Sequence, residues 1–267
     1  MIRDITLGQY YPVDSVLHRM DPRTKLFGTL VFIVSLFFAN SIACYVAATL
    51  FLITAIRMSK VPFSFMVRGL KAIVFLLLIS VSFNLFLTPG TPVVQFGIFK
   101  ITHEGIRTAG FMALRLIYLV IGSSVMTLTT TPNQLTDGLE RLLRPLNKLH
   151  VPIHEIAMMM SIALRFIPIL MEETDKIMKA QIARGADFET GNIIQKAKNM
   201  IPLLVPLFIS AFRRANDLAM AMEARCYHGG DNRTQMKPLR YESRDYISYV
   251  VMWAYLGIAI VFRIVGI

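Results

Sequence analysis

The sequence predicts an all-α membrane protein with about five transmembrane helices and, before the last of them, a cytoplasmic insert of long amphipathic coupling helices. Apolar residues make up 55% of the 267 positions and charged residues 17%, against about 45–50% and about 25% in typical soluble domains. A near-neutral stretch of about 117 residues, 129–245, precedes the last apolar segment. The apolar residues concentrate in four uncharged runs: Leu26–Ile56, Ala72–Phe99, Leu116–Thr136 and Tyr246–Phe262.

The first 25 residues are expected to form a cytoplasmic amino-terminal segment. They carry charges from Arg3 to Lys25 and lack the apolar core of a signal peptide. We therefore expect residues 1–25 to belong to the mature protein.

The run Leu26–Ile56 is 31 residues long, so it fits either one tilted helix or two short helices that turn at Asn40-Ser41. The loop that follows, 57–71, has four basic residues and no acidic one. Basic loops stay inside, and with the amino terminus inside only two spans return this loop to that side. We therefore predict the spans Leu26–Ala39 and Ile42–Ile56. Both are shorter than the ~20 residues of an ordinary span, which implies a thinned bilayer or shielding by a partner.

Two more spans complete the transmembrane region 26–128, at about Ala72–Leu87 and Thr108–Leu128, and the fifth lies in 246–267. The loop between the third and fourth spans holds Pro89-Gly90 and Pro92, which favour turns, so we expect a small external hairpin there. On this topology the inside segments carry 24 of the 28 lysines and arginines. The chain is thus predicted to be a multi-pass cell-membrane protein with its amino terminus and coupling-helix region in the cytoplasm.

The coupling-helix region, 129–245, holds 16 basic and 13 acidic residues, as a solvated region would. We expect three helices in it, at Pro132–Lys148, about 152–184 and about 192–225. Its apolar patches are interrupted by prolines at 168, 202 and 206 and are too short to cross a bilayer. They are typical of helices in or just under the interface. The two long helices would each measure about 50 Å at ~1.5 Å per residue.

Two tripeptides, Ala183-Arg184-Gly185 and Ala224-Arg225-Cys226, stand 41 positions apart, near the ends of the two long helices. A single arginine at a helix carboxyl end is mildly stabilising by itself. Two such arginines in one insert, each between small residues, favour docking of both helix tips on a partner. The guanidinium fork can form paired hydrogen bonds with a carboxylate, which lysine cannot fully replace.

Methionines are frequent in the same insert, with Met158, Met159, Met160 and Met171 in the second helix. Such side chains adapt to differently shaped partners, although ordinary packing at an interface is the alternative. Arg115 is the one charge inside a predicted span. It could be functional, snorkel to the interface or pair with the backbone of a neighbouring helix.

Motifs for catalysis, cofactors and metals are absent from the sequence. No Gly-Lys dipeptide is present for a phosphate-binding loop, and no Gly-x-Ser-x-Gly for a serine hydrolase. His150 and His154 have helical spacing, but Pro152 between them is expected to break the helix. No basic stripe with interleaved aromatic residues suggests nucleic acid, and Cys44 and Cys226 lie in different regions, so no disulfide is expected.

The paired arginine tripeptides, the insert before the last span and the segment Asp21-Pro22-Arg23-Thr24-Lys25 resemble one family over essentially the whole chain. This is the transmembrane T component (EcfT) of energy-coupling factor vitamin transporters. The resemblance implies a non-catalytic subunit of a four-part importer. Two ATP-binding-cassette ATPases, A and A′, bind ATP and Mg, the T component couples them, and an S component binds the vitamin.

Carried over from the family, Ala183, Arg184 and Gly185 would engage one ATPase, and Ala224, Arg225 and Cys226 the other. The chain departs from the family at Cys226, where glycine is commoner. The methionine-rich helices would contact the S component. Together with the basic amino-terminal segment, they are similar to the shared type of T component, which serves several S components.

Two other classes of function stay open from the residues alone. A conventional ABC importer permease has a Glu-Ala-Ala-x-x-x-Gly coupling loop, which Glu223-Ala224 and Gly229 match in part. Arg225 replaces the second alanine of that loop, and the downstream Ile-x-Leu-Pro is missing. A membrane scaffold without ATPases is the other class.

Overall fold

The computed structural model describes residues 10–39, 41–96, 99–188, 192–229, 236 and 238–265. These residues divide into two compact units. We call the part from 10–138 and 239–265 the membrane unit and the part from 139–238 the hairpin unit, and describe each by itself.

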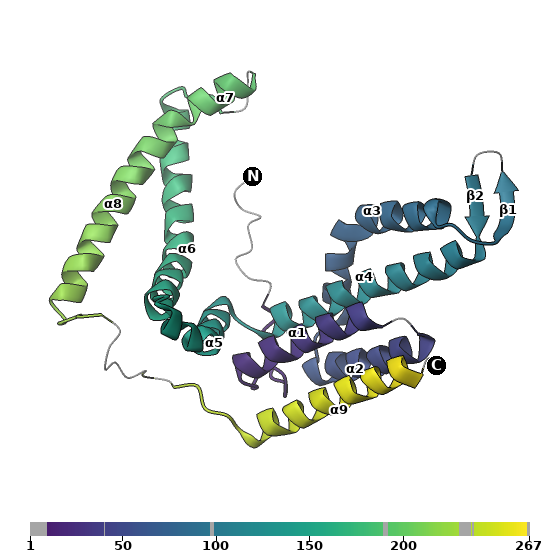
Figure 1. Ribbon diagram of the computed structural model, residues 1–267. Coiled ribbons are helices and arrows are strands. Elements are labelled where there is room, and N and C mark those ends of the chain that lie inside the picture. Colours follow the sequence, from purple (N-terminus) through teal and green to yellow (C-terminus); the bar gives the residue numbers. More distant parts are fainter. Residues whose placement is uncertain are drawn as a thin grey trace. The chain divides into compact units, whose positions relative to one another are not determined.

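The membrane unit contains five long helices (Figure 1): α1 (Pro22–Phe38), α2 (Ile42–Ser59), α3 (Phe63–Leu87), α4 (His103–Thr129) and α9 (Ser243–Val265). α3 packs along α4, α1 contacts α4 and α9, and α2 contacts α9 and α4. The prediction of two helices in 26–56 is confirmed, because α1 ends at Phe38 and α2 begins at Ile42. Of the predicted turn, Asn40 lies outside the described residues.

Side-chain caps explain where several helices begin. The Asp21 carboxylate accepts a hydrogen bond from the Arg23 N–H, and Pro22 occupies the first turn of α1. The Ser41 hydroxyl accepts from the N–H of Cys44 at the start of α2. Such caps satisfy backbone donors that have no partner inside the helix, and proline is compatible with the first turn because it has no N–H to leave unpaired.

The third helix begins at Phe63, nine residues before the predicted Ala72, and it bends by 61° between Phe63–Lys71 and Ile73–Leu87. The predicted hairpin is confirmed. Strands β1 (Pro92–Phe96) and β2 (Phe99–Thr102) pair antiparallel, with Phe96 opposite Phe99.

Among the described residues, four helices are long and apolar enough to cross a membrane: Ile42–Ser59, His103–Thr129, Ile153–Ala183 and Ser243–Ile264. The bent helix α3 would be a fifth, and α1, with 17 residues, is short for a span, as predicted. Of these helices, Ile153–Ala183 lies in the hairpin unit. The predicted helix at about 152–184 is confirmed and continues through Pro168, whereas the expectation that its apolar part is too short to cross a bilayer is wrong by length and composition. The chain is an all-α multi-pass membrane protein with one small hairpin.

The core of the membrane unit lies where α1, α2, α4 and α9 meet. Phe32 of α1 and Phe51 of α2 are stacked, and Phe51 stacks on Tyr255 of α9 with ring centroids 4.6 Å apart. Gly122 of α4 allows the Phe32 ring to approach, since a Cβ at this position would lie 2.7 Å from the ring. Aromatic packing across three helices therefore holds α1, α2 and α9 together at mid-length.

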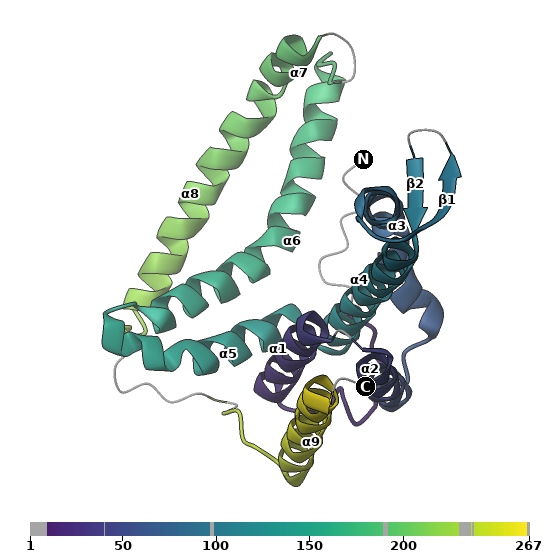
Figure 2. The ribbon, with the colours of Figure 1, turned by 45° about the vertical axis from the view of Figure 1, so that its right-hand side comes forward.

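The hairpin unit consists of α6 (Ile153–Ala183), α7 (Ile193–Asn199) and α8 (Ile201–Glu223) (Figure 2), while α5 (Pro132–Leu143) and the 3-10 helix η2 (Arg144–Leu149) lead into it. The predicted helix 132–148 becomes a 3-10 helix at Arg144, where Pro145 removes a backbone donor. The predicted continuous helix 192–225 is wrong at Met200. There α7 ends, and α8 starts afresh with Pro202 in its first turn. A proline ring clashes with the carbonyl four residues before it, so Pro202 favours a new helix over continuation of α7.

Candidate functional site

The two long helices of the hairpin unit run antiparallel. The Gln181 side-chain amide donates to the Pro202 carbonyl at 3.4 Å, where α6 ends and α8 begins. Farther from this end, Arg214 of α8 donates to the Glu173 carboxylate of α6, with 2.8 Å between Nη2 and Oε2, and the Ser210 hydroxyl donates to the other carboxylate oxygen. Residue numbers thus fall along α6 as they rise along α8, and Figure 2 shows the same arrangement.

This arrangement places the two arginine tripeptides at opposite ends of the hairpin. Arg184 directly follows the last residue of α6, and Arg225 lies two residues after the end of α8. The 23 residues of α8 span about 35 Å at ~1.5 Å per residue. The two arginine tips are therefore separated by about this distance. α8 is shorter than the ~50 Å predicted because the break at Met200 removes its first turns.

The carboxyl end of α6 is closed by a Schellman motif. Gly185 has a positive φ of 87° and its N–H donates to the Ile182 carbonyl at 2.9 Å. The next N–H, from Ala186, reaches back to the Gln181 carbonyl at 3.0 Å. This pair of bonds satisfies carbonyls that the helix itself leaves free, so Arg184 projects from a fully hydrogen-bonded turn.

The end of α8 repeats the pattern. Cys226 has a positive φ of 56° and its N–H donates to the Glu223 carbonyl at 2.8 Å, while the Tyr227 N–H donates to the Met222 carbonyl at 3.0 Å. Each arginine therefore directly precedes a left-handed residue in the same turn. A left-handed backbone favours glycine, so cysteine at position 226 carries a steric cost that Gly185 does not.

All six residues of the tripeptides are exposed. Within the described parts of the chain, neither Arg184 nor Arg225 forms an ion pair. Both guanidinium groups are thus available to carboxylate or carbonyl oxygens of another molecule. Sequence reasoning placed these residues at helix ends, and the structure adds that the two ends share one conformation.

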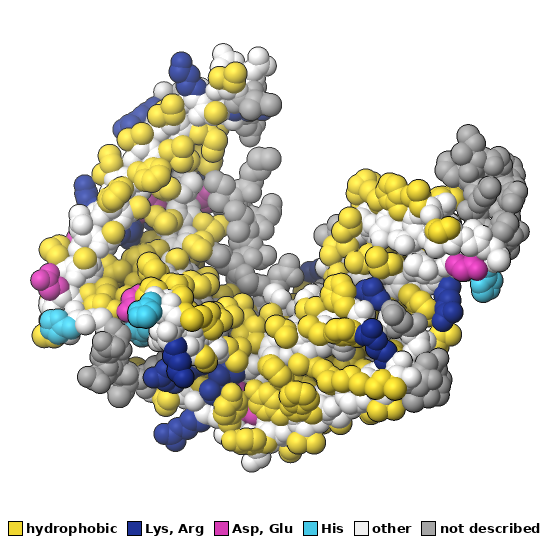
Figure 3. All heavy atoms as spheres, in the orientation of Figure 1, with side chains coloured by type: hydrophobic (Ala, Val, Ile, Leu, Met, Phe, Trp, Pro, Cys, Tyr) yellow, Lys and Arg dark blue, Asp and Glu magenta, His cyan; other side chains and the backbone are white. Residues whose placement is uncertain are grey.

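The methionines predicted to contact a partner differ in exposure. Met159 and Met160 are 57% and 44% exposed, whereas Met158 and Met171 are half-buried. Figure 3 shows hydrophobic side chains along α6 and α8. A larger exposed apolar stripe lies on α8, formed by Ile201, Leu204, Val205, Phe208, Ile209 and Phe212. Sequence reasoning noted this apolar patch but not as a site, although its spacing of three and four residues was the signal of one helix face.

The segment 21–25 forms a clamp that joins three helices of the membrane unit. The Asp245 carboxylate, only 1% exposed, accepts the Asp21 N–H at 2.9 Å and the Glu242 N–H at 2.9 Å. Asp21 also pairs with Arg23 at 2.7 Å, and the Arg23 guanidinium lies 3.9 Å from the centre of the Tyr241 ring. Burial raises the pKa of Tyr241 to about 12. The start of α1 is thereby tied to the start of α9.

Lys25 of the clamp reaches α4 and, through the His18 carbonyl at 3.4 Å, the amino-terminal segment. Lys25 Nζ donates to the Thr129 carbonyl at the end of α4, at 2.9 Å. His18 lies 3.0 Å from the Tyr11 carbonyl through Nε2 and 2.6 Å from the Ser15 hydroxyl through Nδ1. Because a carbonyl only accepts, Nε2 carries the proton in the neutral ring. Burial lowers the pKa of His18, which favours this neutral form.

Arg115, the charge within the predicted fourth span, pairs with the backbone of a neighbouring helix. Its Nη2 donates to the Ala39 carbonyl at 3.0 Å, directly after the end of α1. Of the three roles that the sequence left open, this backbone contact is the one present in the structure.

Comparison with known proteins gives a consistent result. The family model described as cobalt transport protein (CbiQ) matches residues 14–236. A relative from Clostridium kluyveri is 55% identical over 266 residues, which is 99% of this chain and 98% of the relative. One from Bacillus subtilis is 46% identical over 260 residues, 96% and 98% of the two chains. Both relatives are named energy-coupling factor transporter transmembrane protein EcfT. The chain therefore belongs to the EcfT family of transmembrane components of energy-coupling factor transporters, proteins that work in a membrane complex with other subunits.

Proposed function

We propose that this chain couples two ATPase subunits to a vitamin-binding S component of an importer. One observation carries the proposal: two arginine-bearing helix ends of the same conformation lie at opposite ends of one antiparallel hairpin. Two like ends about 35 Å apart at ~1.5 Å per residue suit two separate partners that present similar grooves. The names of the relatives support the same kind of complex.

In this proposal each helix tip enters a groove of one ATPase. Ala183 and Gly185 on one tip, and Ala224 and Cys226 on the other, are small enough to let the partner backbone approach. Arg184 and Arg225 then donate to carboxylate or carbonyl oxygens in the groove. ATP and Mg are bound and ATP is hydrolysed in the partner subunits, and this chain performs no catalysis.

The hairpin unit lies in or under the cytoplasmic interface, on the same side as the amino terminus. α6 is long and apolar enough to cross a bilayer, but Glu172, Glu173, Asp175, Lys176 and Lys179 in its carboxyl-terminal half favour the interface. The S component would then contact the exposed Met159 and Met160, together with Met158, Met171 and the apolar stripe of α8. A flexible methionine surface suits several S components in turn.

Coupling requires that a displacement of one tip reach the rest of the hairpin. The contacts of Glu173 with Ser210 and Arg214, together with that of Gln181 with Pro202, hold α6 and α8 to one another. ATP binding would draw the ATPases together and move the two tips relative to each other. The hairpin would pass this movement to the S component, which then reorients and releases vitamin inside.

The test is the double variant Arg184→Glu/Arg225→Glu in the complete transporter. The measurements are co-purification of the ATPase subunits and uptake of labelled vitamins, tried one at a time. We expect both to be lost, because each substitution places a carboxylate where the groove must accept a cation.

The matched control is Arg165→Glu/Arg213→Glu, which changes one exposed arginine in the body of α6 and one in the body of α8. This control should retain ATPase binding. Normal uptake by the Arg184→Glu/Arg225→Glu transporter would contradict the proposal. A vitamin bound by this chain alone, without an S component, would instead favour a conventional permease.

A further inference from the structure

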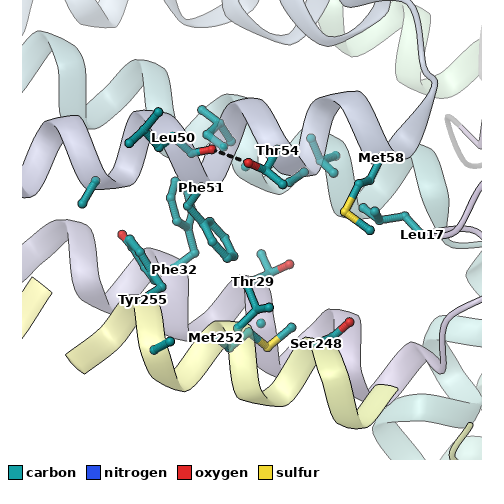
Figure 4. Close-up of a pocket in the computed structure, with 18 of the residues that line it drawn as sticks. Leu17, Thr29, Phe32, Leu50, Phe51, Thr54, Met58, Ser248, Met252 and Tyr255 are labelled. Carbon is teal, nitrogen blue, oxygen red and sulfur yellow. Dashed lines mark hydrogen bonds between the residues drawn. The ribbon is translucent and has the colours of Figure 1, made fainter. Parts of the chain in front are cut away.

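A cavity of about 880 Å³ lies inside the membrane unit, between α1, α2, α4 and α9. Figure 4 shows side chains from α2, such as Thr54 and Met58, and from α9, such as Met252, on opposite sides of this space. Ligand pockets in proteins have volumes of about 300–1,000 Å³, so this volume is large enough for a sizeable ligand. The cavity is lined by helices whose residues include none of the arginine tripeptides.

The few polar groups on the walls are already hydrogen-bonded to the chain itself. The Thr54 hydroxyl donates to the Leu50 carbonyl at 2.7 Å, the dashed bond in Figure 4. The Thr29 hydroxyl donates to the Lys25 carbonyl at 2.9 Å, and the Tyr255 hydroxyl lies 2.7 Å from that of Ser35. Lys25, the charged residue of the lining, likewise donates to the Thr129 carbonyl at 2.9 Å. The walls therefore need no polar partner, and an apolar ligand satisfies them.

The cavity is long and opens sideways. On α2 its walls extend from Ala43 to Met58, about 22 Å at ~1.5 Å per residue. Half of a bilayer hydrocarbon core is about 15 Å thick, so an extended acyl chain fits along it. Of the lining residues, Leu50 on α2 is 63% exposed and Val251 on α9 is 48% exposed, so the space is not closed off from its surroundings.

Those surroundings are hydrocarbon, because α2 and α9 are both long and apolar enough to cross a membrane. An apolar space this large would forfeit many dispersion contacts if it were empty. The acyl chains of the surrounding lipid are the apolar material at hand to fill it.

A cation lies on the same helix face at one end of the cavity. Arg57 follows Thr54 by three residues and Leu50 by seven, so it lies on the helix face that carries these two lining residues, next to Met58 at the end of the lining. Arg57 is exposed, and in the described parts of the chain no ion pair involves it. Of the acidic groups of the clamp, Asp21 is paired with Arg23, and Asp245 accepts hydrogen bonds from backbone N–H groups.

We propose that this cavity binds an anionic phospholipid, with one acyl chain between α1, α2 and α9 and the phosphate on Arg57. The acyl chain supplies the apolar contacts that the walls lack, and the guanidinium binds the phosphate. The lipid would thereby be part of the folded membrane unit rather than an exchangeable neighbour.

The experiment uses the complete chain, alone and in the assembled transporter, in phosphatidylcholine vesicles that contain phosphatidylglycerol with a photoreactive group in its acyl chain. Labelled residues are mapped by mass spectrometry. We expect label on Phe32 and Met252, which line the cavity but are only 3% and 8% exposed. If the unsubstituted chain, tested without its partners, is labelled on outward-facing residues but not on Phe32 or Met252, the proposal is overturned.

Two substitutions test the acyl position. Ala47→Phe/Ala254→Phe adds two rings to the cavity wall and should lower label on Met252 at least about tenfold, because the rings take the space of the chain. Ile53→Phe/Ile260→Phe adds the same ring to outward-facing positions of α2 and α9 and should leave this label unchanged. Undiminished label on Met252 in a folded Ala47→Phe/Ala254→Phe chain would contradict the proposal.

The headgroup is tested by Arg57→Gln, with Lys71→Gln as the control for loss of one positive charge. Arg57→Gln should lower label from the phosphatidylglycerol probe about fivefold, the factor for roughly 1 kcal/mol per basic residue at an anionic surface. A phosphatidylcholine probe should be unaffected. Equal labelling of the unsubstituted chain by the phosphatidylglycerol and phosphatidylcholine probes would refute the preference for an anionic lipid. Loss of the Met252 label in the assembled transporter would show that a partner subunit fills the cavity there, and would refute the proposal as a whole.

Discussion

Gly185 and Cys226 occupy equivalent positions at the ends of two antiparallel helices. Both have a positive φ, at 87° and 56°, and each donates its N–H to a carbonyl three residues back. The arginine that directly precedes each of them therefore leaves its helix from the same turn. A partner that recognises one tip by its backbone shape would find the same shape at the other, although only one of the two residues is glycine.

The first prediction concerns the cost of cysteine at the left-handed position. Cys226→Gly should stabilise the last turn of α8 by about 1 kcal/mol, because glycine adopts a positive φ without the steric penalty of a Cβ. Gly185→Ala should destabilise the end of α6 by a similar amount. The measurement is hydrogen exchange of the amides in the last turn of each helix.

The control for this pair is Ala224→Gly, which places glycine in the final helical turn, where φ is −61°. It should weaken the end of α8 rather than strengthen it. If Cys226→Gly weakens the protection of these amides against hydrogen exchange as much as Ala224→Gly does, the left-handed turn does not limit the stability of the end of α8.

The second prediction concerns the polar contact between α6 and α8. Glu173→Gln and Arg214→Gln should each destabilise the hairpin unit by roughly 1 kcal/mol, since the side chains are 23% and 39% exposed and solvent weakens the pair. The double variant should be no less stable than the worse single variant, and a double-mutant cycle measures this coupling. Arg213→Gln, which alters the adjacent exposed arginine, is the control. Strict additivity of Glu173→Gln and Arg214→Gln would mean that the ion pair contributes nothing.

The third prediction concerns pH and His18. Burial lowers the pKa of this histidine in the folded chain, whereas in the unfolded chain it stays near the usual ~6.5. The unfolded state therefore binds the proton more readily, and the stabilisation from neutral His18 is present above about pH 6.5 and is lost as the pH falls below that value. Thermal unfolding between neutral and mildly acidic pH measures the loss. His18→Asn should flatten this dependence, and an unchanged pH slope in that variant would assign it to another group.

How much the sequence predicts differs between local and distant features. The split of 26–56 into two helices follows from a basic loop and the positive-inside rule, and α1 and α2 confirm it. The prolines are harder. Pro202 starts a new helix at Met200, yet Pro168 and Pro206 lie inside continuous helices. All three remove a backbone donor, so the presence of a proline alone does not predict whether a helix continues through it.

Within the candidate site the same contrast holds. Alanine, arginine and a small residue near the end of an apolar pattern were enough to place both tripeptides at helix ends. The left-handed turn at Cys226 could not be predicted, because cysteine gives no signal for a positive φ. The clamp joins Asp21 to Asp245 across 224 positions, so sequence patterns identified the first residue only through family resemblance and gave no reason to pair it with the second.

The last prediction tests this clamp. Asp245 is 1% exposed, and its two carboxylate oxygens accept one backbone N–H each, from Asp21 and from Glu242. Asp245→Asn leaves a single acceptor oxygen, so one buried N–H loses its partner at a cost of about 1–3 kcal/mol. Asp245→Ala removes both acceptors and should cost more.

The measurement is the thermal stability of the complete chain, together with hydrogen exchange at residues 10–25, where release of the clamp should first appear. Glu242→Gln is the matched control. Its carboxylate is 58% exposed and pairs with Arg244 at the surface, so its loss should change stability by no more than about 0.5 kcal/mol. We expect thermal stability to rise in the order Asp245→Ala, Asp245→Asn, Glu242→Gln. Equal stability of Asp245→Asn and Glu242→Gln would show that the Asp245 contacts do not hold α1 to α9.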